Sequence, residues 1–223
     1  MNRPAWALRY PNPNPIALKE GKTKNISDQN KGLLAAPGVY TTTMYLAHNG
    51  SVKQLDQPVE FNVKPLYKGS LEGASPEEAS DFWRTYEATA KRASAIDKAL
   101  TKTEQKIKAM SKALMQSAVH PEQGLVKLEA LKNQYNTLKT AFYGNQAKLE
   151  IGEKNPPTVM EKIFTIYLSL GRSTYGPTET NKKQIQIIDQ MISKAEDELS
   201  GIQKSLDSLE DVLNASHGPY IDD

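Results

Sequence analysis

The feature that most constrains the fold is the spacing of apolar residues near the C-terminus. They recur at alternating intervals of three and four residues, and no other segment keeps so regular a repeat. Because an α-helix has 3.6 residues per turn, this spacing places one narrow apolar seam along a long helix, and the seam must be buried against other helices. We predict a helix over 178–215, with Thr178 as its candidate N-cap. Its seam comprises Ile188, Ile192, Ala195, Leu199, Ile202, Leu206, Leu209 and Leu213.

Three further segments carry helical signals. The sequence Ser75-Pro-Glu-Glu combines an N-cap serine, a proline at the first helical position and a glutamate at the third, and it predicts a helix over 76–117. A second helix is predicted over 122–150, after Pro121, and a short one over 158–170. The expected seam of the second helix is Leu128, Leu131, Tyr135, Leu138, Phe142 and Leu149. Together these helices predict an elongated antiparallel three-helix coiled-coil bundle over 75–216.

Charge is distributed unevenly between the first and the last predicted helix. Residues 75–120 carry eight Lys or Arg against six Asp or Glu, whereas residues 178–223 carry four against ten. Opposite charge on two helices is neutralised when they pack side by side. We therefore interpret the asymmetry as interhelical pairing rather than as a charged binding face.

A second pattern, with a period of two, lies between Gly38 and Val63. The segment is rich in Val, Thr and Tyr, which favour strands. Asn49-Gly50 interrupts it, and this dipeptide accepts the positive φ angles of a two-residue hairpin turn. We predict two antiparallel strands, with Pro58 at the start of the second.

The N-terminal segment adds a third predicted strand. Trp6, Leu8 and Tyr10 are spaced by two, which would place them on one inner face with Arg9 pointing outward. The non-periodic residues 11–34 are expected to form a long loop. Residues 1–70 are therefore predicted to form a small antiparallel β-sandwich of the immunoglobulin or fibronectin type. With the bundle, this makes an α+β chain.

Composition and spacing disfavour several kinds of chemistry. The chain has no cysteine, and its net charge of +2 comes with no dense run of Lys and Arg, so we expect no nucleic-acid partner. The three histidines, His48, His120 and His217, have no ligand-type residue one helical turn away, and we expect no metal and no cofactor. The most apolar run, 163–170, is shorter than the ~20 residues of a membrane span.

Carboxylates are abundant at 196–198 and 210–211, where they fall on the predicted C-terminal helix. A glycosidase requires two carboxylates that face each other across a cleft, and a narrow bundle does not provide one. We predict no catalytic residue in this chain.

Three short motifs, taken in order, suggest a family. They are a Trp-x-Leu-Arg-Tyr-Pro strand, a Pro-Gly-x-Tyr hairpin and a Gly-Pro-Thr turn before the last helix. Their residues are Trp6, Leu8, Arg9, Tyr10 and Pro11, then Pro37, Gly38 and Tyr40, then Gly176, Pro177 and Thr178. This order resembles the C-terminal region of exported bacterial proteins with sortilin-like or BNR-type β-propeller repeats, often labelled glycosyl hydrolase. The resemblance implies a sandwich and a bundle that follow a propeller, and a periplasmic or cell-surface location; a cytoplasmic location stays open.

The favoured hypothesis is a non-catalytic structural and protein-interaction module, the C-terminal part of such a propeller-containing protein. One alternative is a stand-alone subunit of a cell-envelope complex that binds through its bundle. Another is a hydrolase acting on glycans or peptides, with its site mostly outside this chain and Arg9 and Asp28 as the candidates within it. The patterns do not predict an oligomeric state.

Overall fold

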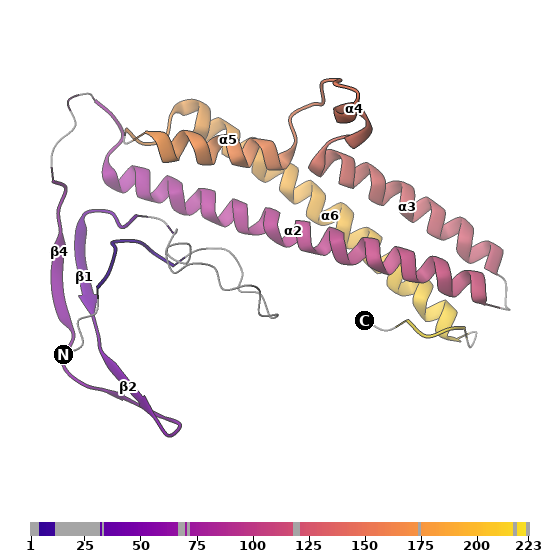
Figure 1. Ribbon diagram of the computed structural model, residues 1–223, viewed down its shortest axis with the longest axis horizontal. Helices are drawn as coiled ribbons and strands as arrows, with labels where there is room; N and C mark the ends of the chain where they lie inside the picture. The colour runs from indigo at the N-terminus through magenta and orange to yellow at the C-terminus, as the bar shows by residue number, and fades with distance from the viewer. Residues whose placement is uncertain are drawn as a thin grey trace. The chain divides into compact units, whose positions relative to one another are not determined.

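The computed structural model describes residues 5–11, 32, 34–66, 70, 72–117, 121–173, 175–215 and 218–221. Helices account for most of these residues (Figure 1). The strands are β1 (Gly38–Thr42), β2 (Tyr45–His48), β3 (Ser51–Gln54) and β4 (Val59–Val63). The helices are α2 (Pro76–Gln116), α3 (Pro121–Tyr143), α4 (Gln146–Glu150), α5 (Val159–Arg172) and α6 (Glu179–Ala215).

The chain divides into two compact units. The N-terminal unit comprises Met1–Thr85 and Leu170–Thr178, and the helical unit comprises Tyr86–Ser169 and Glu179–Asp223. The start of α2 thus belongs to the N-terminal unit, whereas the sequence suggested a boundary near residue 75.

In the helical unit, α2 and α6 run parallel and α3 runs antiparallel to both. Hydrogen bonds and ion pairs join α2 to α6 at a nearly constant separation of about 100 residues, as between Thr103 and Gln203, which is the signature of parallel helices. The bonds from Tyr135 and Tyr143 to α2 reverse that order. Figure 1 shows the three helices side by side.

The predicted seams form the core of this unit. All eight seam residues of α6 from Ile188 to Leu213 are buried, and Ile188, Ile192 and Leu206 are fully enclosed. The predicted seam of α3 from Leu128 to Phe142 is buried as well, and so are the residues of α2 that recur at intervals of three and four between Ala93 and Leu114. The three-four periodicity is confirmed for these helices, because the residues at these positions are buried.

The predicted helix over 122–150 is broken, and its last seam residue was assigned wrongly. α3 ends at Tyr143, because Gly144 adopts a left-handed φ of 87° and its N–H bonds back to the carbonyl oxygen of Thr140 at 2.8 Å. Asn145 then caps the short helix α4, where its side chain accepts a bond from the N–H of Lys148. Leu149 lies on α4 and is 48% exposed, outside the core.

A capping box starts α5. The Thr158 N–H donates to Glu161 Oε2 at 2.9 Å, and the Glu161 N–H donates to Thr158 Oγ1 at 3.2 Å. The helix then buries Val159, Ile163 and Ile166. At α2, the predicted Ser75 cap is confirmed, because its Oγ accepts the Glu78 N–H at 3.1 Å.

The strands form one long, nested hairpin. β2 pairs with β3 around Asn49 and Gly50, both at positive φ, so the predicted turn is confirmed. β1 pairs with β4 in a separate ladder. Two residues, 43–44, connect β1 to β2, whereas four residues, 55–58, connect β3 to β4. The returning arm of the hairpin is therefore two residues longer than the outgoing arm between the two ladders.

The predicted immunoglobulin- or fibronectin-like sandwich is wrong. The described residues contain two separate two-stranded sheets, and their strands have no buried residue. The expected third strand fails because Leu8 takes a φ of 56° and the Trp6 indole N–H bonds to the carbonyl oxygen of Arg9 at 2.8 Å. That tight turn ends the alternation and leaves only an isolated bridge between Arg9 and Leu34.

The turn before α6 packs against the segment before α2 within the N-terminal unit. The Ala74 N–H donates to the carbonyl oxygen of Tyr175 at 2.9 Å. Gly176 has a φ of 79°, and a Cβ at this position would lie 2.5 Å from the Cβ of Ala74. Glycine is therefore required here for both its backbone conformation and its size.

Candidate functional site

The most elaborate polar contact between α2 and α6 centres on Arg92. Its guanidinium binds Glu196 in a bidentate manner, with Nε–Oε1 at 3.0 Å and Nη2–Oε2 at 2.6 Å. It also binds Asp189 and, at 2.9 Å, Ser193 Oγ. The hydrogen bonds with Glu196 raise the pKa of Arg92 and lower that of Glu196.

A second clamp between the same helices centres on Lys106. Its ammonium lies 2.8 Å from Asp207 and 2.6 Å from Glu210, and these bonds raise the pKa of the lysine above its usual value. Together with Arg92, it confirms that the basic surface of α2 faces the acidic surface of α6. The carboxylates of Glu196 and Glu210 are occupied by this pairing.

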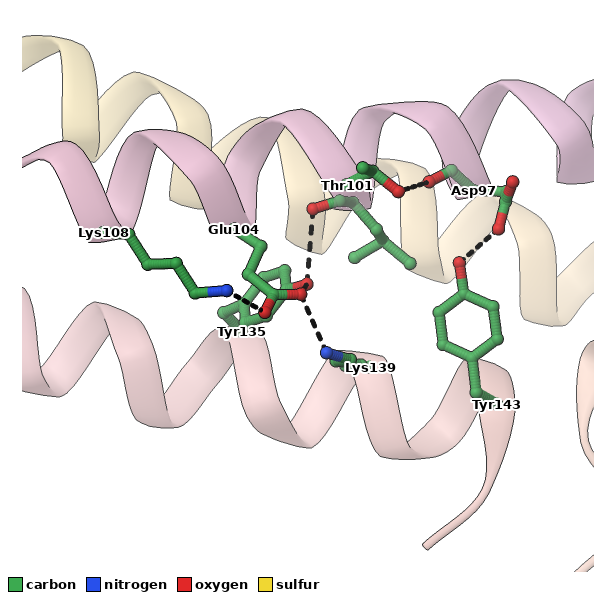
Figure 2. A network of polar contacts seen from close by, with 8 residues as sticks. Asp97, Thr101, Glu104, Lys108, Tyr135, Lys139 and Tyr143 are labelled. Carbon is green, nitrogen blue, oxygen red and sulfur yellow. Dashed lines mark hydrogen bonds and ion pairs between the residues drawn. The ribbon is translucent and has the colours of Figure 1, made fainter. Parts of the chain in front are cut away.

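Glu104 organises the contact between α2 and α3 (Figure 2). It accepts hydrogen bonds from Lys108 at 2.8 Å, from Lys139 at 2.8 Å and from the Tyr135 hydroxyl at 3.1 Å. The two lysines, with Tyr135 adding a smaller effect, lower the pKa of Glu104 to about 2. Two turns earlier on α2, Asp97 accepts a hydrogen bond from the Tyr143 hydroxyl.

These groups are held in one protonation state near neutral pH. Burial, and next the neighbouring carboxylates Glu104 and Asp97, raise the pKa values of Tyr135 and Tyr143, so both hydroxyls stay protonated. Glu104 stays ionised. A general acid or base needs a pKa close to the working pH, and none of these three groups has one. The network is suited to holding α2 and α3 together.

An open groove lies between α3 and α6, with a volume of about 430 Å³. Its floor is apolar and its two cations, Lys127 and Lys204, come from different helices. The lining residues are Lys127, Ala130, Leu131, Lys204, Ser205, Ser208, Leu209 and Val212. Sequence reasoning missed this groove, although the small residues Ser205 and Ser208 on the outer side of an otherwise strongly charged helix are the signal that could have indicated it.

The outer hairpin, β2 and β3, is exposed along its whole length. All of its residues are exposed, including Tyr45 at 60%, Leu46 at 50% and Val52 at 71%. The register places Tyr45, Ala47 and Val52 on one face, because cross-strand partners share a face and successive residues alternate. Leu46 lies on the opposite face, so apolar side chains are exposed on both.

The structure brings part of the first and second predicted motifs together. Trp6 lies 5.2 Å from Tyr40 and 5.9 Å from Phe61 between ring centroids, and the Tyr40 hydroxyl donates to the carbonyl oxygen of Ala36 at 2.7 Å. Arg84 lies 5.9 Å above the ring of Tyr10.

None of the residues of the first two motifs is buried. Trp6 and Leu8 remain 41% and 38% exposed, so their expected role as an inner strand face is wrong. Arg9 donates to the carbonyl oxygen of Gly32 at 3.0 Å. Pro37 precedes β1 and Gly38 is its first residue, and Pro11 follows Tyr10 in the described N-terminal segment. The third motif occupies the turn before α6, where Gly176 is required, Pro177 is buried and Thr178 is exposed.

The remaining candidates do not converge on a site. His48 ends β2, and its carbonyl oxygen accepts the Ser51 hydroxyl at 2.8 Å. His120, His217 and Asp28 lie outside the described residues. Within the described part of the chain, no group of three His, Asp or Glu side chains could hold a metal ion.

Comparison with known proteins adds no relative. No protein-family model matches the chain, and neither a curated protein nor a solved structure is significantly similar to it. The resemblance to sortilin-like propeller proteins therefore stays a prediction. Of the helices that the structure describes, none has both the length and the hydrophobicity needed to traverse a bilayer.

Proposed function

We propose that this chain is a non-catalytic protein-interaction module that binds a protein partner through the hairpin of β2 and β3. The exposure of that hairpin carries the proposal, since Tyr45, Leu46 and Val52 each leave half or more of their surface in solvent. An isolated two-stranded hairpin is marginally stable in water. A partner that covers these side chains supplies the burial that the hairpin lacks, and exposed apolar patches commonly mark such surfaces.

The backbone of the hairpin supports the same mode of binding. His48 and Ser51 flank the two-residue turn, so the next pair, Ala47 and Val52, does not exchange hydrogen bonds across the ladder. The N–H and C=O groups of Ala47 and Val52 therefore point outward, toward the open edges of this sheet. An extended segment of a partner can pair with such an edge while its side chains pack on Tyr45 or Val52.

The polar contacts of the helical unit fit a carrier role. The charged groups that join its helices are paired with one another around Arg92, Lys106 and Glu104. Groups engaged in this way stiffen a unit and are not poised to exchange protons with a substrate. We therefore assign recognition to the hairpin and mechanical support to the helices.

Photocross-linking in the native cell tests the proposal. A benzophenone side chain replaces Val52 in one sample and, as the matched control, Lys194, whose side chain is 79% exposed on α6, in the other. We expect one defined protein adduct from position 52 and none from position 194. Adding Tyr45→Ser should reduce the adduct at 52. The same adducts from both positions, or none from 52, would refute the assignment.

The resemblance to exported propeller proteins suggests which partner to look for. In that hypothesis the partner is a preceding β-propeller domain of the same protein; in the alternative it is a component of a cell-envelope complex. The mass of the native protein separates the two. A band at 24.7 kDa supports a separate subunit, and a much larger band that contains these residues supports the propeller protein.

A further inference from the structure

We infer that the groove between α3 and α6 is a second docking surface, which receives an acidic amphipathic helix of a partner protein. The inference rests on the helical unit alone and goes beyond the hairpin proposal. Its basis is the charge and shape of the groove, about 430 Å³ in volume, with Lys127 on one helix and Lys204 on the other.

The charge of the groove differs from that of the other two helix contacts. Between α2 and α6, Arg92 and Lys106 each bind two carboxylates, and between α2 and α3, Lys139 binds Glu104. In the part of the chain that the structure describes, Lys127 and Lys204 form no ion pair. At the contact between α3 and α6, both lysines are therefore available to bind an anionic group of a partner.

The shape of the groove suits a helix. Leu131 and Leu209 line the groove, and they are the most buried of its apolar residues, at 9% and 6% exposed, so they form its floor. Ala130, Ser205 and Ser208 are small and leave room above that floor. Two roughly parallel ridges with an apolar bottom accept side chains from a third helix at positions i, i+3 or i+4, and i+7.

The apolar and charged residues of the groove together define the partner. Val212 remains 61% exposed at the rim and extends the apolar surface. A docked helix therefore needs apolar residues on one stripe and carboxylates on its flanks, where they reach Lys127 and Lys204. Acidic side chains beside an apolar stripe are the arrangement by which paired helices choose their partners. A neutral or basic helix would leave both lysines without counter-charge.

Two synthetic helical peptides serve as probes. Both carry Leu and Ala on one stripe, and they differ only in the flanking residues, Glu in one and Lys in the other. Binding to the full chain is followed by fluorescence anisotropy at low and at moderate salt. We expect saturable binding of the Glu peptide that weakens several-fold as salt rises, and no binding of the Lys peptide.

Paired variants assign the binding to the groove. In the double variant Lys127→Glu, Lys204→Glu, the affinity for the Glu peptide should fall at least about tenfold, and binding of the Lys peptide should appear. The control variant Lys98→Glu, Lys183→Glu changes the net charge equally at two positions that do not line the groove. It should keep binding of the Glu peptide within about twofold, because the peptide is expected to contact the groove lysines specifically. Attraction that depended only on net charge would instead weaken equally in both variants.

A filled groove provides a test without any change of charge. Ala130→Trp should block the Glu peptide, whereas Asn136→Trp, on an exposed part of α3 outside the groove, should not. Thermal unfolding of all four variants should follow that of the parent chain, since each replaces an exposed side chain.

Four outcomes would overturn the inference. The Glu peptide fails to bind, or the control variants weaken it as much as the groove variants do. A third outcome is a dimer in sedimentation that the double variant Lys127→Glu, Lys204→Glu dissociates, because a second copy of the chain would then be the occupant. A fourth is lysine-dependent binding of dodecanoate without binding of the Glu peptide, which would make the groove a site for lipid anions. Loss of the hairpin cross-link would leave these results unaffected, so the two proposals fail separately.

Discussion

Glu104 receives hydrogen bonds from three side chains on two helices, and its ionisation is coupled to folding. Its pKa in the folded chain is about 2, against an ordinary value of 4.5. A carboxylate with a lowered folded pKa stabilises the fold above its ordinary pKa, and that contribution is lost as the pH falls through the folded value. The stabilisation is therefore present at neutral pH and declines between about pH 4.5 and pH 2.

Glu104→Gln should lower the free energy of unfolding by about 1 kcal/mol at neutral pH, because the two lysines lose a charged acceptor. The difference from the parent chain should shrink as the pH falls from 4.5 toward 2. Urea unfolding followed by circular dichroism measures both quantities. Glu129→Gln, which removes an exposed pair with Lys132, is the control and should change the stability little. An equal and pH-independent loss in both variants would contradict the assignment.

Single residues also show where sequence reasoning stops. The Asn49-Gly50 turn and the Ser75 cap are local, because the signal and its consequence lie within four residues, and both could be predicted. The backbone conformation of Leu8 could not be predicted. Its positive φ is set by the indole bond to Arg9 and by a bridge to Leu34, and no spacing in the sequence records that pairing.

Among the elements, α6 and α4 mark the limits of the periodic signal. The seam of α6 predicts burial because the helix is long enough for the pattern to repeat several times. Leu149 continues the register of α3, but a left-handed glycine intervenes and places it on another helix. Periodicity reports which residues would share a face, and it does so only while the backbone stays helical.

Leu206→Ala should therefore cost about 2–5 kcal/mol in the free energy of unfolding, because it opens a cavity at a fully buried site. Leu149→Ala should cost less than about 1 kcal/mol, since the side chain is already 48% exposed. Chemical unfolding of the two variants in parallel provides the comparison. Similar losses in both would mean that Leu149 belongs to the core after all.

At the scale of the whole molecule, the two units differ in how their surfaces are used. The helical unit buries long seams, whereas the strands of the N-terminal unit bury no residue. The sequence could predict the helices and the hairpin, and it overestimated the sheet because strand-forming residues do not reveal whether a second sheet exists to cover them. The groove was missed because it depends on which helices become neighbours.

Hydrogen exchange should divide the chain accordingly. Amides of β2 and β3 should exchange about 100-fold or more faster than those of Ile202 and Leu206 in α6, because the hairpin opens without disrupting a core. Exchange monitored by NMR or mass spectrometry gives the ratio. Equal protection would mean that the hairpin is covered in solution.

The two extra residues of the second hairpin strand have a consequence for length variation. Side chains alternate between the faces of a strand, so an insertion of two keeps parity and an insertion of one reverses it. Phe61 meets Trp6 and Tyr40 on one face of β1 and β4. Removal of a single residue from 55–58 would move the side chains of β4 to the opposite face relative to those of β3. Removal of two residues would keep them on the same face. Homologous hairpins should therefore differ here by even numbers of residues.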